Sequence, residues 1–120
     1  MLVVDDEVLI ADMLREELED AGFEVLVAND GDWALAILGE PDGGIAAVVT
    51  DINMGATPDG WAVARRGREL NPNLPVVYMT GGAAADWPVH GVPRSVLVAK
   101  PFVAVQIVTA LSTLLNSAAE

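Results

Sequence analysis

Short apolar runs alternate with helical patterns along this chain of 120 residues, and a glycine, proline, asparagine or aspartate stands at each junction. Residues 45–50 are apolar almost without interruption, which is typical of a strand covered on both faces in a parallel sheet. We predict five strands, in chain order at residues 2–4, 24–28, 45–50, 75–79 and 95–99. The repeated alternation of strand and helix indicates an α/β protein built from βαβ units.

Helices are predicted between and after these strands. Apolar residues from Ile10 to Ala21 recur on one helical face, and Gly22 is well suited to end that helix. Asn29 or Asp30 can cap the next one. The predicted helices span residues 10–21, 33–38, 59–70 and 103–115, and in the last of them the residues expected to face the sheet are Val103, Ile107, Ala110 and Leu114.

Five such units indicate one domain, which we expect to span residues 1–120. Right-handed crossovers would place helices on both faces of a single, doubly wound, five-stranded parallel sheet. In sheets of this kind ligands bind beyond the carboxyl ends of the strands. The residues that follow the strands are therefore the most informative about function.

The composition disfavours several classes of function. Eighteen acidic residues against six basic ones give a net charge of −12, which opposes binding to nucleic acid and to anionic membrane surfaces. No apolar stretch approaches the roughly 20 residues that cross a bilayer, and no signal sequence follows Met1. The chain has no cysteine, which excludes disulfides and zinc–thiolate sites and agrees with a cytoplasmic protein.

Polar or charged residues follow four of the five predicted strands. Asp5 and Asp6 follow the first strand, Asp51 the third, Thr80 the fourth and Lys100 the fifth. Three carboxylates at one sheet edge would repel one another unless a cation lay among them, and Mg²⁺ prefers such oxygen ligands while leaving room for a phosphate. A lysine and a threonine can bind phosphoryl oxygens, so we expect a site for Mg²⁺ and a phosphoryl group.

In this order and at these strand ends, the residues resemble the receiver domains of two-component response regulators. The resemblance covers the whole chain and implies a flavodoxin-like fold with strand order 2-1-3-4-5. The segments that carry it are Leu2-Val3-Val4-Asp5-Asp6, Asp51 with Asn53-Met54, Gly60, Thr80-Gly81 and Lys100-Pro101-Phe102.

The resemblance also implies a role for each site residue. Asp51 would accept a phosphoryl group from a phosphohistidine on a sensor histidine kinase or a histidine phosphotransfer protein. Asp6, Asp51 and the backbone carbonyl of Asn53 would ligate Mg²⁺, with Asp5 acting mainly through water. Thr80 and Lys100 would sense the phosphoryl group, and the Lys100-Pro101 peptide bond would be cis. Such a domain is a conformational switch and not an enzyme with a diffusible substrate.

Three departures from the family pattern concern how the domain would pass its phosphorylation state on to a target. Gly55 stands where a proline usually follows the methionine, and residues 56–58 lengthen that loop. Leu97 occupies a position where most receivers carry a tyrosine or phenylalanine that moves on activation, so aromatic switching is not expected there. Residues 81–93 are rich in glycine and alanine and predict at most a short helix.

Other interpretations remain open for the chain and for single residues. The chain could be a small Mg²⁺-dependent aspartyl-phosphate phosphatase, although Asn53 stands where a general acid is needed, or an unphosphorylated interaction module. Both a stand-alone regulator and a domain of a hybrid kinase fit this length. Asp5 and Asp6 could cap a helix, Thr80 could satisfy a backbone group, and Lys100 could be a solvated lysine.

Two further expectations concern the surface. His90 is expected to lie on the surface without a catalytic role, and the three tryptophans are expected to pack, with Trp87 partly exposed. The last helix has a second apolar flank. Either the segment around Trp87 covers this flank, or it binds a partner, which would be a second copy of the chain or a downstream protein. Its members are Ala104, Val108, Leu111 and Leu115.

Overall fold

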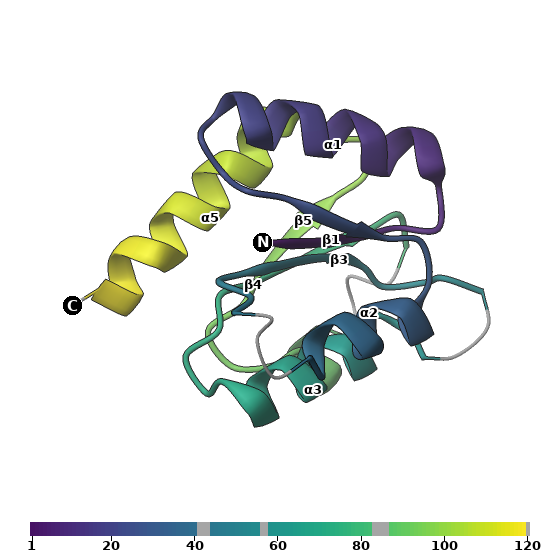
Figure 1. Cartoon of the computed structure of the whole chain (residues 1–120), viewed down its shortest axis with the longest axis vertical. Helices are drawn as coiled ribbons and strands as arrows, with labels where there is room; N and C mark the ends of the chain where they lie inside the picture. The colour runs from purple at the N-terminus through teal and green to yellow at the C-terminus, as the bar shows by residue number, and fades with distance from the viewer. Residues whose placement is uncertain (41–43, 56–57, 83–86, 120) are drawn as a thin grey trace.

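The strands form one parallel sheet in the order β2-β1-β3-β4-β5, as predicted (Figure 1). The computed structural model describes residues 1–40, 44–55, 58–82 and 87–119. The strands are β1 (Leu2–Val4), β2 (Leu26–Ala28), β3 (Val48–Asp51), β4 (Val76–Thr80) and β5 (Val96–Ala99). All neighbouring pairs run parallel, so the carboxyl ends of the strands lie at one edge of the sheet.

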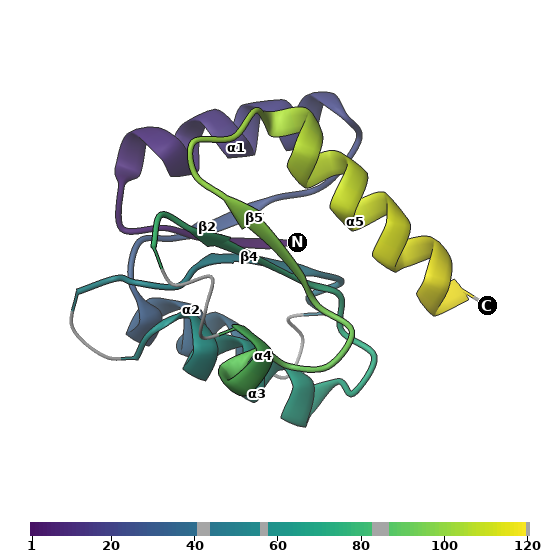
Figure 2. The ribbon, with the colours of Figure 1, turned by 180° about the vertical axis from the view of Figure 1, so that it is seen from behind.

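Helices cover both faces of this sheet. Figures 1 and 2 show α1 and α5 on one face and α2, α3 and α4 on the other. The helices are α1 (Val8–Asp20), α2 (Gly31–Leu38), α3 (Gly60–Leu70), α4 (Trp87–His90) and α5 (Ala104–Ala119). The chain is thus the doubly wound α/β fold that the alternating pattern predicted.

The two cores follow from the alternation of side chains along each strand. Leu2 and Val4 of β1 are buried with Trp61 on the side of α2 and α3. Val3, between them, is buried with Leu14 on the side of α1 and α5. Every residue of β1 and β3 is buried, so the absence of an apolar–polar alternation in these strands is explained by helices on both faces.

Aspartates begin two of the helices. The Asp30 carboxylate accepts a hydrogen bond from the backbone N–H of Trp33 at 2.7 Å, so Asp30, and not Asn29, caps α2. Asp59 caps α3 in the same way. The N-cap of α1 is Glu7, which makes no side-chain capping bond, so neither Asp5 nor Asp6 caps that helix.

Three strands are shorter than predicted: β2, β3 and, by one residue, β5. β2 begins at Leu26 and β3 at Val48, since both pair with Leu2, the first residue of β1, which lies between them. Residues upstream of Leu26 and Val48 have no β1 residue opposite them to extend the ladder. Apolar composition located the strands within residues 24–28 and 45–50, but pairing set where each strand starts.

The last helix differs from its predicted orientation. It begins at Ala104, so Val103 precedes it and is 63% exposed instead of facing the sheet. Leu111, which was assigned to the second apolar flank, is fully buried in the core beside Ile107. The buried arc of α5 is therefore rotated toward Leu111, and the second flank is narrower than the sequence predicted.

The prediction that Trp87 covers α5 is wrong. Trp87 packs against the core on the α2 and α3 side, which is the opposite face of the sheet (Figure 2). Its indole N–H donates to the Ser95 hydroxyl at 2.9 Å, and its ring fills the space where Gly91 has no side chain. His90 is exposed, as expected. Binding of a partner to the remaining α5 flank stays a prediction.

In the part of the chain that the structure describes, every helix is too short or too polar to cross a membrane.

Candidate functional site

Three aspartates meet at the carboxyl edge of the sheet. Asp5 follows β1 and is fully buried, and Asp51 ends β3 and is 5% exposed. Asp6 is exposed beside them. One carboxylate oxygen of each lies within 4.8 Å of the others. The backbone N–H of Glu7 donates to Asp5 Oδ1 at 2.9 Å, which fixes the turn between β1 and α1.

Lys100 reaches this cluster from the end of β5. Its Nζ lies 3.4 Å from Asp5 Oδ2 and 3.5 Å from Asp51 Oδ1. A third carboxylate, Glu7 Oε1, lies 3.6 Å from the same Nζ. The Lys100 backbone N–H donates to the Thr80 carbonyl at 2.7 Å, and the Lys100-Pro101 peptide bond is cis. Lys100 is thus held among carboxylates and is not a solvated surface lysine.

Burial and mutual repulsion change the acidity of the aspartates. The pKa of Asp51 is raised to about 6, mainly by burial and also by the charges of Asp5 and Asp6, while Lys100 opposes the increase. Burial likewise raises the pKa of Asp5 above its ordinary value, against the hydrogen bond from Glu7 and the charge of Lys100. These directions show that a single lysine does not fully compensate the buried carboxylates.

Lys100 responds in the opposite sense. Burial alone would lower the pKa of its ammonium, but the charges of Asp5 and Asp51 outweigh burial, so the pKa lies above the ordinary lysine value. The lysine therefore stays charged at neutral pH.

Thr80 ends β4 at the same edge and is only 2% exposed. Its Oγ1 accepts a hydrogen bond from the backbone N–H of Gly82 at 3.1 Å, which ties the start of the loop after β4 to the strand. A hydroxyl can accept one hydrogen bond and donate another, so this contact is compatible with donation to a ligand oxygen.

Gly60, the first residue of α3, packs against the backbone of Asp51. A Cβ at Gly60 would overlap the carbonyl oxygen of Asp51, and the Gly60 N–H donates to the Ile52 carbonyl at 2.9 Å. Because no side chain is present, the start of α3 lies directly behind the residue that carries the central carboxylate.

The loop after Asp51 is described in part. Asn53 is exposed, Met54 is buried, and Gly55 has a φ of 75°, a left-handed conformation that favours glycine over proline. Residues 56–57, in the predicted lengthening of this loop, lie outside the described residues. The role of the Asn53 carbonyl stays a prediction.

Glu7 was not among the residues expected at the site. It directly follows the acidic pair Asp5-Asp6, which was the only available signal, and the sequence pattern does not reveal that its carboxylate turns toward Lys100. Leu97 lies on β5, which β4 separates from the strand that carries Asp51, and it packs against the core on the α2 and α3 side.

The donor set fits a hard divalent cation. It consists of three carboxylates on one edge, and two of them are buried and have raised pKa values. A cation that prefers oxygen ligands would remove the repulsion among them. Asp6 is exposed, so one side of the cluster is open for water or a phosphate oxygen.

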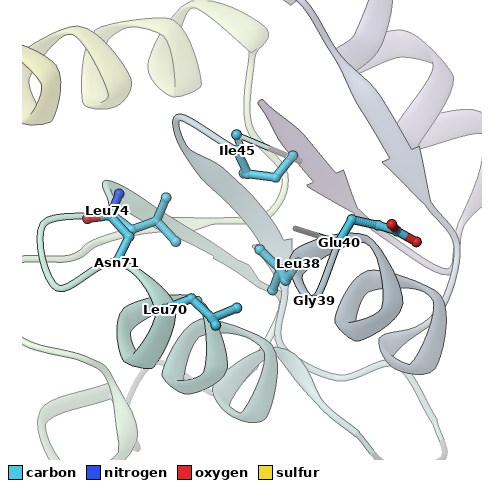
Figure 3. Close-up of a pocket in the computed structure, with 9 residues that line it drawn as sticks. Leu38, Gly39, Glu40, Ile45, Leu70, Asn71 and Leu74 are labelled. Carbon is cyan, nitrogen blue, oxygen red and sulfur yellow. The ribbon is translucent and has the colours of Figure 1, made fainter. Parts of the chain in front are cut away.

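A separate hollow of about 330 Å³ lies at the opposite edge of the sheet, between the C-terminal ends of α2 and α3 (Figure 3). Its walls include Leu38, Leu70 and Leu74, with Glu40 at the rim. It contains none of the strand-end aspartates and does not belong to the carboxylate site.

Comparison with known proteins agrees with this geometry. The family model described as the response regulator receiver domain matches residues 1–112. The sensor histidine kinase RcsC of Salmonella typhimurium is 37% identical over 86 residues, which are 72% of this chain and 9% of the kinase. The transcriptional regulatory protein PrrA of Mycobacterium tuberculosis is 34% identical over 120 residues, which cover 97% of this chain and 49% of PrrA.

Solved structures are similar over nearly the whole chain. A response regulator receiver protein from Sinorhizobium medicae has a TM-score of 0.92 at 44% identity and covers 98% of this chain and 94% of its own. The receiver domain of NtrX from Brucella abortus has a TM-score of 0.81 at 33% identity, with coverage of 96% and 97%. The chain spans less than half of RcsC and PrrA, whereas it matches isolated receiver domains almost end to end. The chain therefore belongs to the response regulator receiver domains, the phosphorylatable domains of two-component signalling systems.

Proposed function

We propose that Asp51 is the phosphoryl acceptor of this receiver. An oxygen of its carboxylate attacks the phosphorus of a phosphohistidine, an O–P bond forms, the P–N bond breaks, and the imidazole of the donor leaves. The observation that carries this assignment is the position of Lys100 Nζ, 3.5 Å from Asp51 Oδ1 in a nearly buried cluster. Asp5 is fully buried, and Asp6 does not contact Lys100 in any ion pair that the described residues form. Asp51 keeps a small area exposed to a phosphoryl donor and also has the Lys100 ammonium beside it.

Mg²⁺ is the cation we propose for the carboxylate cluster. The carboxylates of Asp6 and Asp51 and the backbone carbonyl of Asn53 would hold it, with Asp5 acting mainly through water. When bound, Mg²⁺ neutralises charge on the transferring phosphoryl group. Asp5, Asp6 and Asp51 keep the ligand oxygens together, since their carboxylates come within 4.8 Å of one another.

Lys100 and Thr80 are the proposed phosphoryl-sensing residues. The Lys100 ammonium already lies beside Asp51, so it needs little movement to meet an oxygen of a phosphoryl group there. Thr80 ends the adjacent strand β4, and its hydroxyl can donate to another such oxygen while it accepts from Gly82. A shift of Thr80 would then be passed to the loop that begins at Gly81.

The donor we propose is a sensor histidine kinase or a histidine phosphotransfer protein. An apolar surface borders the cluster on α1 and the β5–α5 loop, where Leu9 is 85% exposed and Val103 is 63% exposed. Ile10, Met13, Lys100, Pro101 and Phe102 line a hollow of about 360 Å³ in this surface. Such a surface suits an apolar helix face that presents its phosphohistidine to Asp51.

The protein is proposed to act as a switch and not as an enzyme with a diffusible substrate, and a cytoplasmic location is part of this proposal. Water would later attack the aspartyl phosphate at phosphorus and release phosphate, which restores the Asp51 carboxylate. The phosphatase alternative has less support, since Asn53 stands two residues after Asp51, where such an enzyme needs a general acid, and an amide cannot act as one.

Intact-mass spectrometry tests the acceptor. The chain is incubated with acetyl phosphate and Mg²⁺, and we expect one added phosphoryl group. Asp51→Asn should abolish the addition, whereas Asp32→Asn, a matched change at an exposed position of α2, should leave it intact. Unchanged addition in Asp51→Asn, or in excess chelator, would contradict the proposed chemistry.

A further inference from the structure

Glu7 contacts Lys100 without belonging to the carboxylate cluster. Lys100 Nζ lies at 3.4 to 3.6 Å from oxygens of Asp5, Asp51 and Glu7. The side chain of Glu7 is 62% exposed, whereas those of Asp5 and Asp51 are 0% and 7% exposed. The lysine therefore has two buried anionic partners and one that faces solvent.

The two buried partners are the ones that a divalent cation would share. Asp5 and Asp51 belong to the group of carboxylates that can hold an ion, and Glu7 does not. A cation and the Lys100 ammonium carry charge of the same sign, so they compete for these oxygens and repel each other. When the cation binds, the carboxylate left to Lys100 among its described ion-pair partners is that of Glu7.

We propose that Glu7 is a positioning residue for Lys100: its carboxylate holds the ammonium at the rim of the site when a divalent cation engages Asp51 directly and Asp5 through water. This inference rests on the proposed function and adds a residue to it. Glu7 lowers the free-energy cost of cation binding, because Lys100 keeps its contact with Glu7 when its contacts with Asp5 and Asp51 are lost. The Glu7 carboxylate also keeps the Lys100 ammonium within reach of a phosphoryl group on Asp51.

The position of Glu7 in the chain supports this role. It is the N-cap of α1, and its backbone N–H donates to Asp5 Oδ1 at 2.9 Å. Its backbone is thereby fixed to the same aspartate that Lys100 contacts, while its side chain makes no capping bond and is available to the lysine. An exposed ion pair of this kind changes an equilibrium by about two- to fivefold.

A double-mutant cycle on Mg²⁺ affinity tests the proposal without relying on phosphorylation. Affinity is measured by titration calorimetry for the full chain and for Glu7→Gln, Lys100→Met and the double variant. Glu7→Gln should weaken Mg²⁺ binding about two- to fivefold, because Lys100 then stays on Asp5 and Asp51. Lys100→Met should strengthen binding, and in its presence Glu7→Gln should have no further effect.

The cycle separates this role from simple attraction between Glu7 and the cation. If Glu7→Gln weakens Mg²⁺ binding equally with and without Lys100, the carboxylate acts directly on the ion and the proposal is wrong. An unchanged affinity in Glu7→Gln would also overturn it. Glu16→Gln, the same charge change on the exposed face of α1, should leave the affinity unaltered and controls for net charge.

The proposed function is tested separately in the same samples. If the unaltered chain gains a phosphoryl group at Asp51 but the cycle shows no coupling, only the role of Glu7 fails. If the unaltered chain binds no Mg²⁺ and gains no phosphoryl group, the proposed function fails and the role of Glu7 with it. Glu7→Asp, which keeps the charge, should restore part of the affinity lost in Glu7→Gln.

Discussion

Tyr78 of β4 lies directly opposite Leu97 of β5 in the parallel ladder. The tyrosine is fully buried, its ring meets that of Trp61 edge-on at 4.7 Å between centroids, and its hydroxyl accepts the backbone N–H of Val92 at 3.1 Å. The aromatic side chain of this part of the sheet is thus on β4, one strand away from the position where Leu97 departs from the family pattern. It is anchored, through Val92, to the segment that follows α4.

Tyr78→Phe should lower the melting temperature markedly. The change keeps the ring but leaves the buried N–H of Val92 without its acceptor, which costs about 1–3 kcal/mol. Ser95→Ala, which removes the acceptor of the Trp87 indole in a half-buried place, should cost less because water can replace the hydroxyl. Thermal unfolding of the two variants compares the effects, and a smaller loss in Tyr78→Phe than in Ser95→Ala would contradict this account.

The fold could be predicted from the sequence because its signals are local and repeated. Apolar runs such as residues 45–50 and helix starts such as Asp59 depend only on neighbouring residues. Strand starts did not follow from composition, since Leu26 and Val48 are set by pairing with Leu2 across the sheet. The orientation of α5 was also missed at Leu111, because a helix that is apolar on more than one face does not reveal which face packs.

Gly60→Ala should displace Asp51 and destabilise the fold. The added methyl group would overlap the Asp51 carbonyl, and relieving that overlap by moving backbone costs about 1–3 kcal/mol. Gly82→Ala is the matched control, because a Cβ there meets nothing within 4 Å. Chemical denaturation gives the stability of each. Equal stability of the two variants would show that α3 does not hold Asp51 in place.

Mg²⁺ should raise the melting temperature of the chain. Without a cation, Asp5, Asp6 and Asp51 repel one another, and a ligand that binds only the folded state stabilises it. Asp6→Ala should remove most of the rise, measured by thermal unfolding over a series of Mg²⁺ concentrations. Asp12→Ala, on the outer side of α1, should keep it. A rise that persists unchanged in Asp6→Ala would place the ion elsewhere.

Stability without Mg²⁺ should decrease as the pH rises. Burial raises the pKa of Asp51 from 3.8 to about 6 on folding, so the protonated carboxyl is favoured in the folded state. Its contribution is complete below the unfolded pKa and is lost as the pH rises through about 6. The melting temperature should therefore fall between about pH 4 and about pH 7, and the rise caused by Mg²⁺ should grow over that interval.

Asp51→Asn tests the origin of this pH dependence. The amide does not titrate, so the fall in melting temperature should become shallower, with Asp5 contributing what remains. Asp32→Asn should keep the original slope. If Asp51→Asn shows the same slope as the unaltered chain, the raised pKa of Asp51 does not govern it.

The site was predictable in its strand-end residues and not in its periphery. Asp5, Asp51, Thr80 and Lys100 end or follow neighbouring parallel strands, and the topology alone brings them to one edge. The contact between Glu7 and Lys100 depends on side-chain directions at a turn, and the packing of Gly60 on Asp51 depends on how closely α3 approaches β3. These contacts depend on the geometry of the folded backbone, and they leave no recognisable pattern in the sequence.

The assignment of Asp51 as the phosphoryl acceptor is tested most directly by locating the modified residue. A phosphohistidine-bearing kinase or phosphotransfer protein phosphorylates the chain in Mg²⁺, borohydride reduces the aspartyl phosphate, and peptide mass spectrometry finds the homoserine that forms. We predict homoserine at residue 51, none in a sample treated with chelator before transfer, and none at Asp5 or Asp6. Homoserine at another aspartate, or phosphate retained on the chain after Asp51→Asn, would contradict the account.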